Sequence, residues 1–418
     1  MFDSTALLGM LRSFRILSGD RDARSFWLCR GSELLADWVF IVALFVTVYA
    51  ITSDIAVVAL FMLLRVLPRA VITTSFHAQA ARIGARGLFL LSLPRVPLIA
   101  SLALVDGRSD LVWAGAVVVA YGLLTALTNE ARAAMLPHLV PRPHLVGVIQ
   151  LNAAIERITF VGGPLLAALL LWGWDVEVAF VVSALALGLT SLLLSIQMST
   201  SRGDARALPS WDAPSVSGES AWSVVRHQPT LLLLAGGLFS GAALAICLKV
   251  TLVELATEPL ERSDAMLGLL LALVGVGTLV GPLSVPRLLG HLPVSLIVTG
   301  SAMGIASGLV LISVVTRLEI VALVLLGIGT ISITNDRVTA TATRRIAPEA
   351  DLPATGRVML VAVIAGQLVA ALAVALLARI WETTDVMLAV SIACALLMGV
   401  LFVAADGLSL VTRRLGRS

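Results

Sequence analysis

The sequence is organised as about twelve separate stretches of roughly 20 apolar residues, each ended by charged or turn-forming residues. The hydrocarbon core of a bilayer is about 30 Å thick, and a helix rising about 1.5 Å per residue crosses it in about 20 residues. Hydrophobic residues make up 59% of the chain, against about 45–50% in soluble domains. The sequence therefore predicts an all-α membrane protein with 12 transmembrane helices.

One long polar interval divides the expected helices into two sets of six. Residues 198–229 are rich in Ser, Pro, Asp and Arg, and we expect a flexible cytoplasmic linker there. Residues 1–25 carry four arginines and a short apolar run, which predicts an amphipathic lead-in on the membrane surface rather than a cleavable signal peptide. The expected helices of the first half (26–197) cover residues 26–51, 55–76, 87–105, 111–129, 145–173 and 177–197. Those of the second half (230–405) cover 230–254, 264–284, 292–315, 319–340, 356–380 and 385–405, before a cytoplasmic tail at 406–418.

The arginines indicate how the helices are oriented. Cytoplasmic loops of membrane proteins carry an excess of Lys and Arg. With the N-terminus in the cytoplasm, 20 arginines fall in cytoplasmic segments, and the far side receives only Arg108, Arg262, Arg317 and Arg379. We therefore expect a multi-pass protein of the cell (plasma) membrane with both termini in the cytoplasm. The basic residues form no patch with interleaved aromatic residues, so the pI near 9.1 does not indicate nucleic-acid binding.

The two halves repeat features of each other at an offset of about 204 residues. Residues 129–132 (Asn-Glu-Ala-Arg) close the fourth expected helix, and residues 335–337 (Asn-Asp-Arg) fall near the end of the tenth. Residues 163–164 (Gly-Pro) in the fifth helix correspond to residues 366–367 (Gly-Gln) in the eleventh. An internal repeat of six plus six helices is typical of secondary transporters.

Several classes of function have no support in the sequence. There is no nucleophile–base arrangement, no phosphate-binding glycine loop and no Walker motif, so we expect neither an enzyme nor an ATP-driven pump. The cysteines are widely spaced and form no CxxC motif, which predicts packing residues rather than a metal site or disulfides; they are Cys29, Cys247 and Cys394. No cofactor is expected, and the expected state is a monomer in contact with membrane lipid.

Five short pieces of sequence carry a resemblance to a known family. They are Glu33-Leu34-Leu35-Ala36-Asp37-Trp38, Asn129 to Pro137 with Val140-Pro141-Arg142, Gln150-Leu151-Asn152, Gly163-Pro164 and Gly356-Arg357-Val358. Together they resemble the major facilitator superfamily, and more narrowly its bacterial exporter branch, which includes macrolide-efflux proteins and the enterobactin exporter. The resemblance covers residues 24 to 405. It implies two six-helix halves that rock about a central site to move a small molecule.

The loop between helices 2 and 3 matches the superfamily's signature only in part. The family pattern is G-x-x-x-D-R-x-G-R-R, and the aligned run here is His77 to Arg86. Arg82, Gly84 and Arg86 fit the pattern, whereas the first glycine is His77 and the acidic residue is Ala81. In the family that acid helps to latch the halves on the cytoplasmic side, so its loss predicts that closure depends on other contacts.

The fifth helix resembles the antiporter motif G-P-x-x-G-G of the superfamily. The sequence there is Gly163-Pro164 followed by two leucines and two alanines, which keeps the kink and the small surface needed for close helix approach. This resemblance implies export rather than import.

Carboxylates inside the expected helices are candidate functional residues, because a charge at the bilayer centre costs roughly 2.5–3.5 kcal/mol. Asp37 lies about 16 Å into helix 1, and Glu33 lies one turn nearer the cytoplasm on the same face. In the family fold helix 1 lines the central cavity, so Asp37 is a candidate for proton coupling or substrate contact, with a structural ion pair as the alternative. Glu33 is expected to be the more interfacial of the two.

Helix 5 carries a second polar stripe. Asn152, Glu156 and Gly163 share one face, and Glu156 is expected near mid-depth. Glu156 is predicted to contact substrate or protons, or else to pair with Arg65 or Arg157. Arg65 lies mid-way along helix 2 and is expected to pair with Asp37 or Glu156, since a guanidinium cannot become neutral inside the membrane.

The remaining intramembrane charges have several alternative roles. Arg95 in helix 3 is expected to snorkel or to pair. Lys249 in helix 7 is expected either to face the cavity and an anionic substrate or to snorkel outward. The polar residues near the ends of helices 4 and 10 are expected to form a cytoplasmic gate with the helix 2–3 loop; the gate candidates are Arg82, Arg86, Glu130, Arg132, Asp336 and Arg337.

Three functions are compatible with the sequence. The first is a secondary active exporter of a small amphipathic compound, such as a drug, siderophore or secondary metabolite, coupled to protons. The second is a lipid or lysolipid flippase of the same superfamily. The third is a scaffold or partner protein of a membrane complex that does not itself transport.

Overall fold

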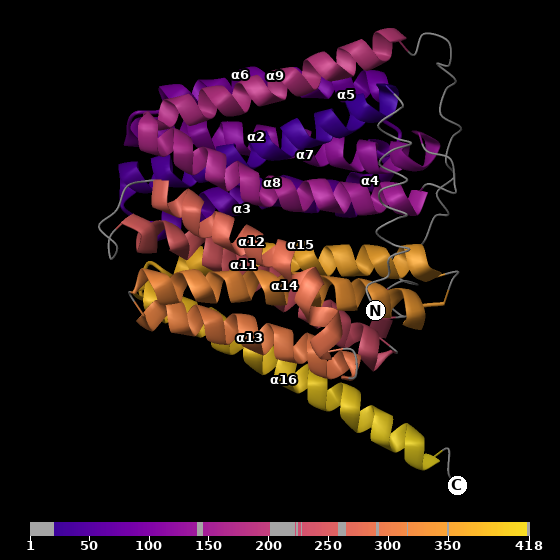
Figure 1. Ribbon diagram of the computed structural model, residues 1–418. Coiled ribbons are helices and arrows are strands. Elements are labelled where there is room, and N and C mark those ends of the chain that lie inside the picture. Colours follow the sequence, from indigo (N-terminus) through magenta and orange to yellow (C-terminus); the bar gives the residue numbers. More distant parts are fainter. Residues whose placement is uncertain are drawn as a thin grey trace. The chain divides into compact units, whose positions relative to one another are not determined.

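The computed structural model describes residues 21–139, 145–200, 222, 225–226, 228–257, 265–289, 292–315, 317–348 and 351–415, and this part of the chain contains helices and no strand (Figure 1). Long helices satisfy every interior backbone N–H and C=O group within the segment, which hydrocarbon requires.

The helices of the first half follow the expected order. They are α2 (Arg21–Thr52), α3 (Ile55–Val71), the π-helical turn η1 (Ile72–Phe76), α4 (His77–Ala80), α5 (Ala85–Ser92), α6 (Arg95–Ser101), the 3-10 turns η2 (Leu102–Leu104) and η3 (Arg108–Asp110), α7 (Leu111–Leu139), α8 (Leu145–Gly173) and α9 (Val176–Thr200).

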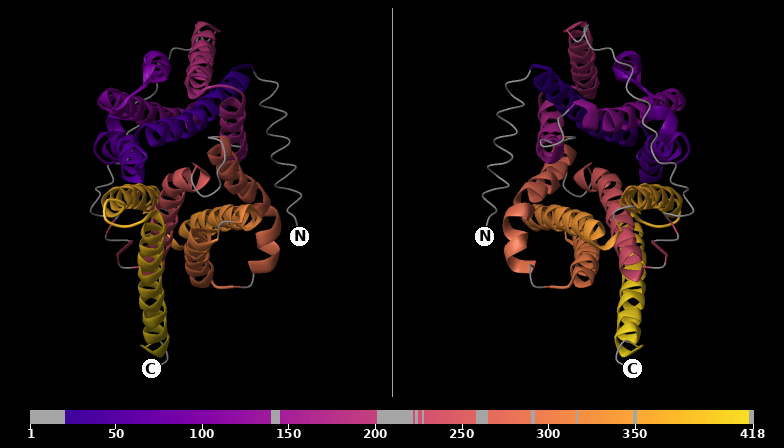
Figure 2. Two further views of the ribbon diagram at one scale, coloured as in Figure 1. Left: turned by 90° about the vertical axis from the view of Figure 1, so that its left-hand side faces the viewer. Right: turned by 90° about the vertical axis from the view of Figure 1, so that its right-hand side faces the viewer.

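The described helices of the second half are longer and less interrupted. They are α11 (Pro229–Thr257), α12 (Ala265–Leu289), α13 (Val294–Val314), α14 (Leu318–Ile346), α15 (Leu352–Leu377) and α16 (Thr383–Leu415). Figures 1 and 2 show that the C-terminal end of α16 runs past the neighbouring ends of α13 and α14, which belong to the same half.

Eleven segments of the described residues are long and apolar enough to cross a membrane, and the described apolar part of α12, Ala265–Gly281, is a shorter twelfth. Each of the 12 expected spans has a helix in the structure, so the predicted fold class is confirmed. Exposed tryptophans occur where the chain leaves these helices, as is common at membrane interfaces. They are Trp113, Trp172, Trp174 and Trp381.

Two expected helices are interrupted. Helix 2 was expected as one α-helix to residue 76, but its last turn is π-helical and is followed by the short α4. Helix 3 was expected to be continuous over 87–105, but it breaks where Leu93 and Pro94 separate α5 from α6. Proline lacks the N–H that would bond to the preceding turn, so the α-helical hydrogen bonds are interrupted there, although Leu93 and Pro94 keep helical dihedral angles.

Three helix ends also differ from the predictions. Helix 1 begins at Arg21, so residues 21–25 of the expected lead-in belong to α2, and residues 1–20 lie outside the described residues. Residues 129–132 do not close helix 4, because α7 continues to Leu139. Likewise α14 continues to Ile346, well beyond the predicted end at residue 340. The expected linker lies mostly outside the described residues, since α9 ends at Thr200 and α11 begins at Pro229.

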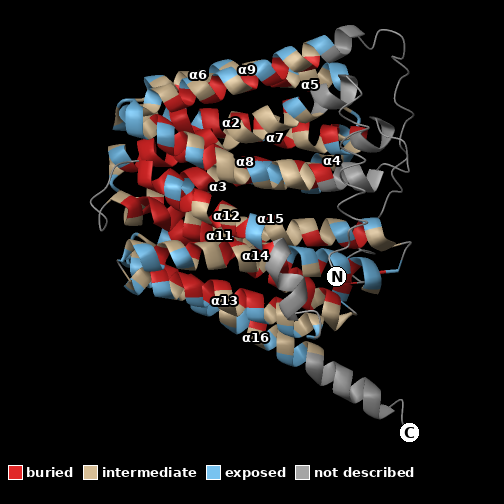
Figure 3. Ribbon diagram, viewed as in Figure 1, coloured by how far each residue is buried: buried red, intermediate tan, exposed pale blue. Residues whose placement is uncertain are grey.

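The chain divides into two compact units, which are described separately. Unit 1 comprises Met1–Ile51, Val71–Asp212 and Ser263–Ala272, and unit 2 comprises Thr52–Ala70, Ala213–Arg262 and Leu273–Ser418. The first helix of each half, α2 or α11, has the largest buried share among the described spans (Figure 3).

In unit 1, small polar contacts join α2 to α9. The Ser183 hydroxyl donates a hydrogen bond of 2.8 Å to the carbonyl of Ala36, and the hydroxyls of Ser32 and Thr190 lie 2.7 Å apart. Such hydroxyl contacts hold helices together in a membrane, where apolar side chains gain little by leaving lipid.

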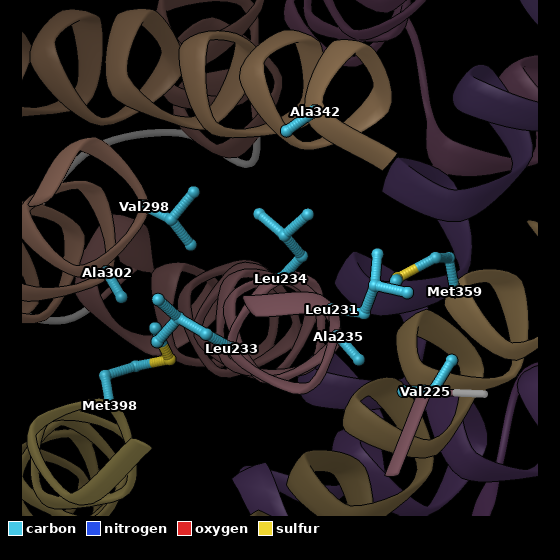
Figure 4. Packing of buried hydrophobic residues seen from close by; sticks show 10 residues of the cluster. All are labelled: Val225, Leu231, Leu233, Leu234, Ala235, Val298, Ala302, Ala342, Met359 and Met398. Atoms are coloured by element: carbon cyan, nitrogen blue, oxygen red, sulfur yellow. The ribbon is translucent and has the colours of Figure 1, made fainter. Parts of the chain in front are cut away.

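In unit 2, α11 is surrounded by four other helices. Figure 4 shows the apolar cluster at its N-terminal end, formed by Val225, Leu231, Leu233, Leu234, Ala235, Val298, Ala302, Ala342, Met359 and Met398. The last five of these residues belong to α13, α14, α15 and α16. Close packing of this cluster fixes α11 as the central helix of unit 2.

The glycines that indicated an internal repeat occupy equivalent places in the two halves. A Cβ atom on Gly163 of α8 would collide with the side chain of Trp38 on α2. A Cβ atom on Gly366 of α15 would collide with the carbonyl oxygen of Phe239 on α11. In each half, therefore, glycine lets the fifth helix approach the first helix closely.

We predict that Gly366→Ala lowers the free energy of unfolding by about 1–3 kcal/mol, because the backbone of Phe239 cannot move away from the added methyl group. The matched control is Gly356→Ala on the same helix, where a Cβ atom would meet nothing within 4 Å. That control should be neutral or slightly stabilising. Thermal unfolding in detergent measures both variants, and equal melting temperatures would contradict the close approach of α15 to α11.

Candidate functional site

Two helices of unit 1 present facing polar stripes. On α2 the stripe is Arg30, Glu33 and Asp37, at spacings of three and four residues. On α7 the stripe is formed by Tyr121, Thr128, Asn129 and Arg132. Side chains at such spacings share one helix face. Polar side chains of α2 can therefore contact those of α7 at successive helical turns.

Glu33 is the centre of this network. Arg95 of α6 donates a hydrogen bond from Nη1 to Glu33 Oε1 at 2.5 Å. Arg132 Nη1 lies 2.5 Å from Glu33 Oε2 as an ion pair that lacks hydrogen-bond geometry, and Arg30 Nη1 lies 3.6 Å from the same oxygen. Only 2% of Glu33 is exposed, so it is buried among the helices of unit 1. Its depth in the membrane relative to Asp37 stays a prediction.

Arg95 contacts Thr128 and Tyr121 in addition to the carboxylate of Glu33. It is 1% exposed, its Nη1 is 3.5 Å from the Thr128 hydroxyl, and its Cζ lies 5.3 Å from the centre of the Tyr121 ring. A guanidinium over an aromatic ring gains a cation–π contact. Of its two predicted behaviours, pairing is confirmed and snorkelling is wrong. The helix break at Pro94 places Arg95 at the first position of α6, where it reaches α2.

Arg30 extends the network to α8. Its Nη1 donates to Asn129 Oδ1 at 3.0 Å, and its Nη2 donates to Glu156 Oε1 at 3.1 Å. Asn152, one turn before Glu156, donates to the same oxygen at 2.8 Å. Arg30 is a partner of Glu156 that the sequence did not predict, and the predicted pairs of Glu156 with Arg65 or Arg157 stay predictions.

Asp37 lies one turn beyond Glu33 and accepts a hydrogen bond of 3.1 Å from the Tyr121 hydroxyl. Tyr121 thus contacts both a carboxylate through its hydroxyl and Arg95 through its ring. Asp37 is half-buried, in contrast to the fully buried Glu33.

Three arginines are the positive groups of this network. Arg30, Arg95 and Arg132 all lie within ion-pair distance of Glu33, and Arg30 also pairs with Glu156. Moving one such ion into a low-dielectric interior costs several kcal/mol, which is offset only by close opposite charges. The set therefore holds together as a unit.

The predicted gate residues do not all lie in one environment. Glu130 accepts hydrogen bonds from Thr73 at 2.8 Å and, with its other oxygen, lies 3.1 Å from Nδ1 of His77. Arg82 and Arg86 are exposed at the helix 2–3 loop. Arg132, by contrast, is buried in the network around Glu33. Asp336 and Arg337 are exposed within α14 rather than at its end. Their joint action as a gate stays a prediction.

The other candidates lie on separate helices. Arg65 and Lys249 are half-buried on α3 and α11, and Arg157 follows Glu156 on α8. The predicted ion pair between Arg65 and Asp37 or Glu156 stays a prediction. Gly163 and Pro164 are buried inside α8, one to two turns from Glu156.

The corresponding place in unit 2 is neutral. Asn335 of α14 donates a hydrogen bond of 3.3 Å to the carbonyl of Gly237 on α11. Asn335 is the counterpart of Asn129, which receives Arg30 in unit 1. The repeated asparagines and glycines are 206 and 203 residues apart, and at these offsets Glu33 and Asp37 fall opposite residues 236–243, none of which is charged.

Comparisons with known proteins bear on the fold. The sequence matches no protein-family model and no curated protein. The structure is similar to a bacterial homologue of the iron transporter ferroportin in an inward-facing state, with a TM-score of 0.66 and 15% identity over 92% of this chain and 98% of that one.

Two further solved structures show the same likeness. One is a bacterial homologue of the human lysosomal transporter Spinster, with a TM-score of 0.65 and 13% identity over 91% of this chain and 97% of that one. The other is the nucleoside transporter NupG, with a TM-score of 0.69 and 10% identity over 93% and 99%. The chain therefore has the same fold as these solved structures, the twelve-helix major facilitator fold.

We predict that Glu33→Gln lowers the free energy of unfolding by roughly 3–5 kcal/mol, because it leaves Arg95 and Arg132 buried without their carboxylate. The control is Glu156→Gln, after which Arg30 keeps Asn129 and Glu33; about 1 kcal/mol or less is expected. The melting temperatures of the two variants are compared by thermal unfolding in detergent. If Glu33→Gln and Glu156→Gln have the same melting temperature, Glu33 is not the centre of the network.

Proposed function

We propose that this protein is a secondary active transporter that moves a small molecule across the plasma membrane by alternating access. The observation that carries the proposal is the similarity to solved transporters over more than nine-tenths of both chains. The fold alone does not specify a substrate. The chain adds a cluster of intramembrane carboxylates, which membrane proteins keep for substrate or ion pathways.

Proton coupling is the second part of the proposal. A carboxylate that alternates between a desolvated and a water-filled environment can bind and release a proton. Asp37 fits this role better than Glu33, because Glu33 lies between three arginines while Asp37 is half-buried and hydrogen-bonded to a tyrosine hydroxyl. Glu33 would then hold the helices in place, and Asp37 would carry the proton.

The direction we propose is export, with both termini in the cytoplasm. The Gly163-Pro164 kink resembles the antiporter motif, and its glycine makes the close contact with α2 that such a motif needs. The orientation is supported by the 20 arginines on the side that contains the termini.

We predict that Asp37→Asn abolishes proton movement driven by substrate. The protein is reconstituted in proteoliposomes that contain a pH-sensitive dye, and a panel of amphipathic drugs and siderophores is added. At least one compound should move protons through the wild type and none through Asp37→Asn. Asp175→Asn, in the exposed turn after α8, is the matched control and should behave as the wild type. Normal proton movement through Asp37→Asn would exclude Asp37 as the coupling residue.

A further inference from the structure

We infer that the inner face of α8, with the carboxylate of Glu156 and the stacked rings of Phe160 and Trp38, binds the positively charged group of an organic cation. The inference rests on the proposed transport function, because it names the substrate class of that site. The proposed ligand is a compound with a permanent positive charge or a protonated amine, which also carries aromatic or apolar groups.

Glu156 lies on the face of α8 opposite the exposed apolar residues of that helix. The large exposed apolar residues of α8 lie along one stripe, formed by Ile158, Leu165, Leu169 and Trp172. Glu156 and Phe160 lie along the opposite stripe, which continues through the buried residues Gly163 and Ala167. A helix that turns its large apolar side chains to lipid turns the other stripe to the protein interior. The exposed part of Glu156 is therefore on the interior side.

The two hydrogen bonds that Glu156 accepts involve only one of its carboxylate oxygens. Both hydrogen bonds to Glu156, from Arg30 and Asn152, reach the same oxygen, Oε1. The side chain is 45% exposed, and Oε2 has no hydrogen bond among the described contacts. The two donors fix the orientation of the carboxylate and leave its second oxygen available to a positively charged donor.

An aromatic surface lies one turn away from Glu156. Phe160 follows Glu156 by four residues, and its ring stacks on that of Trp38 with centroids 4.4 Å apart and planes inclined by 15°. Gly163 makes this possible, because any side chain there would occupy the position of Trp38. Aromatic rings attract cations, and a carboxylate beside them adds charge selectivity.

The exposure of the charged side chains favours a cation over an anion. The three arginines are largely covered, since only 14% of Arg30, 1% of Arg95 and 9% of Arg132 is exposed. Glu33 is buried with them, at 3% exposed. Glu156, at 45%, is much more exposed than any of these four groups, and its charge is negative.

The test compares two probes of the same shape and opposite charge, tetraphenylphosphonium and tetraphenylborate. Equilibrium binding of each labelled probe is measured on the full-length protein in lipid nanodiscs, without any transport step. We expect the phosphonium to bind and the borate to bind at least about tenfold more weakly. Glu156→Gln and Phe160→Leu should each weaken phosphonium binding roughly tenfold or more.

Asp175→Asn, in the exposed turn after α8, is the matched control and should bind the phosphonium as the wild type does. Equal binding of the two probes, stronger binding of the borate, or unchanged phosphonium binding in both Glu156→Gln and Phe160→Leu would overturn the inference. Melting temperatures confirm that the variants are folded. Selective phosphonium binding without transport would count against the proposed function alone, whereas transport of other compounds with no phosphonium binding would count against this inference alone.

Discussion

The contact of the Glu33 carboxylate with three guanidinium groups determines how the helices of the first half pack. Arg30 comes from α2 itself, Arg95 from α6 and Arg132 from α7, so one buried carboxylate joins three helices. Inside the membrane these charged groups are not solvated by water. The cost of burying each one is offset only while its oppositely charged partners remain close to it. Asp37 and Glu156 lie at the edges of this network and keep some exposure.

The two halves share a plan but differ in chemistry. In both, a glycine of the fifth helix contacts the first helix, and an asparagine of the fourth helix contacts the first. Residues 236–243, which fall opposite Glu33 and Asp37, carry no charge. The common contacts position the first helix of each half. In the second half, α11 packs in an apolar cluster with α13, α14, α15 and α16 (Figure 4).

The sequence predicted the helices and the fold better than it predicted contacts. The length and hydrophobicity of each membrane span are set by the thickness of the bilayer. Each span can therefore be predicted from its own sequence, without knowing which helices pack against it. The partners of Glu33 cannot be predicted in this way, because they depend on how α6 and α7 pack against α2, which brings Arg95 and Arg132 to this carboxylate. Two signals could have been used. Arg30 lies one turn from Glu33, and Tyr121 lies on the stripe of Thr128 and Arg132.

The central claim is that the two halves move against each other when a ligand or proton binds. It is tested most directly by electron–electron distance measurements between spin labels on Ala133 of α7 and Thr341 of α14, two exposed positions near the C-terminal ends of corresponding helices. Labels are introduced after replacing the three buried cysteines. The account predicts two distance populations whose ratio shifts with pH and with added tetraphenylphosphonium. A single distribution that is unchanged by either would contradict alternating access.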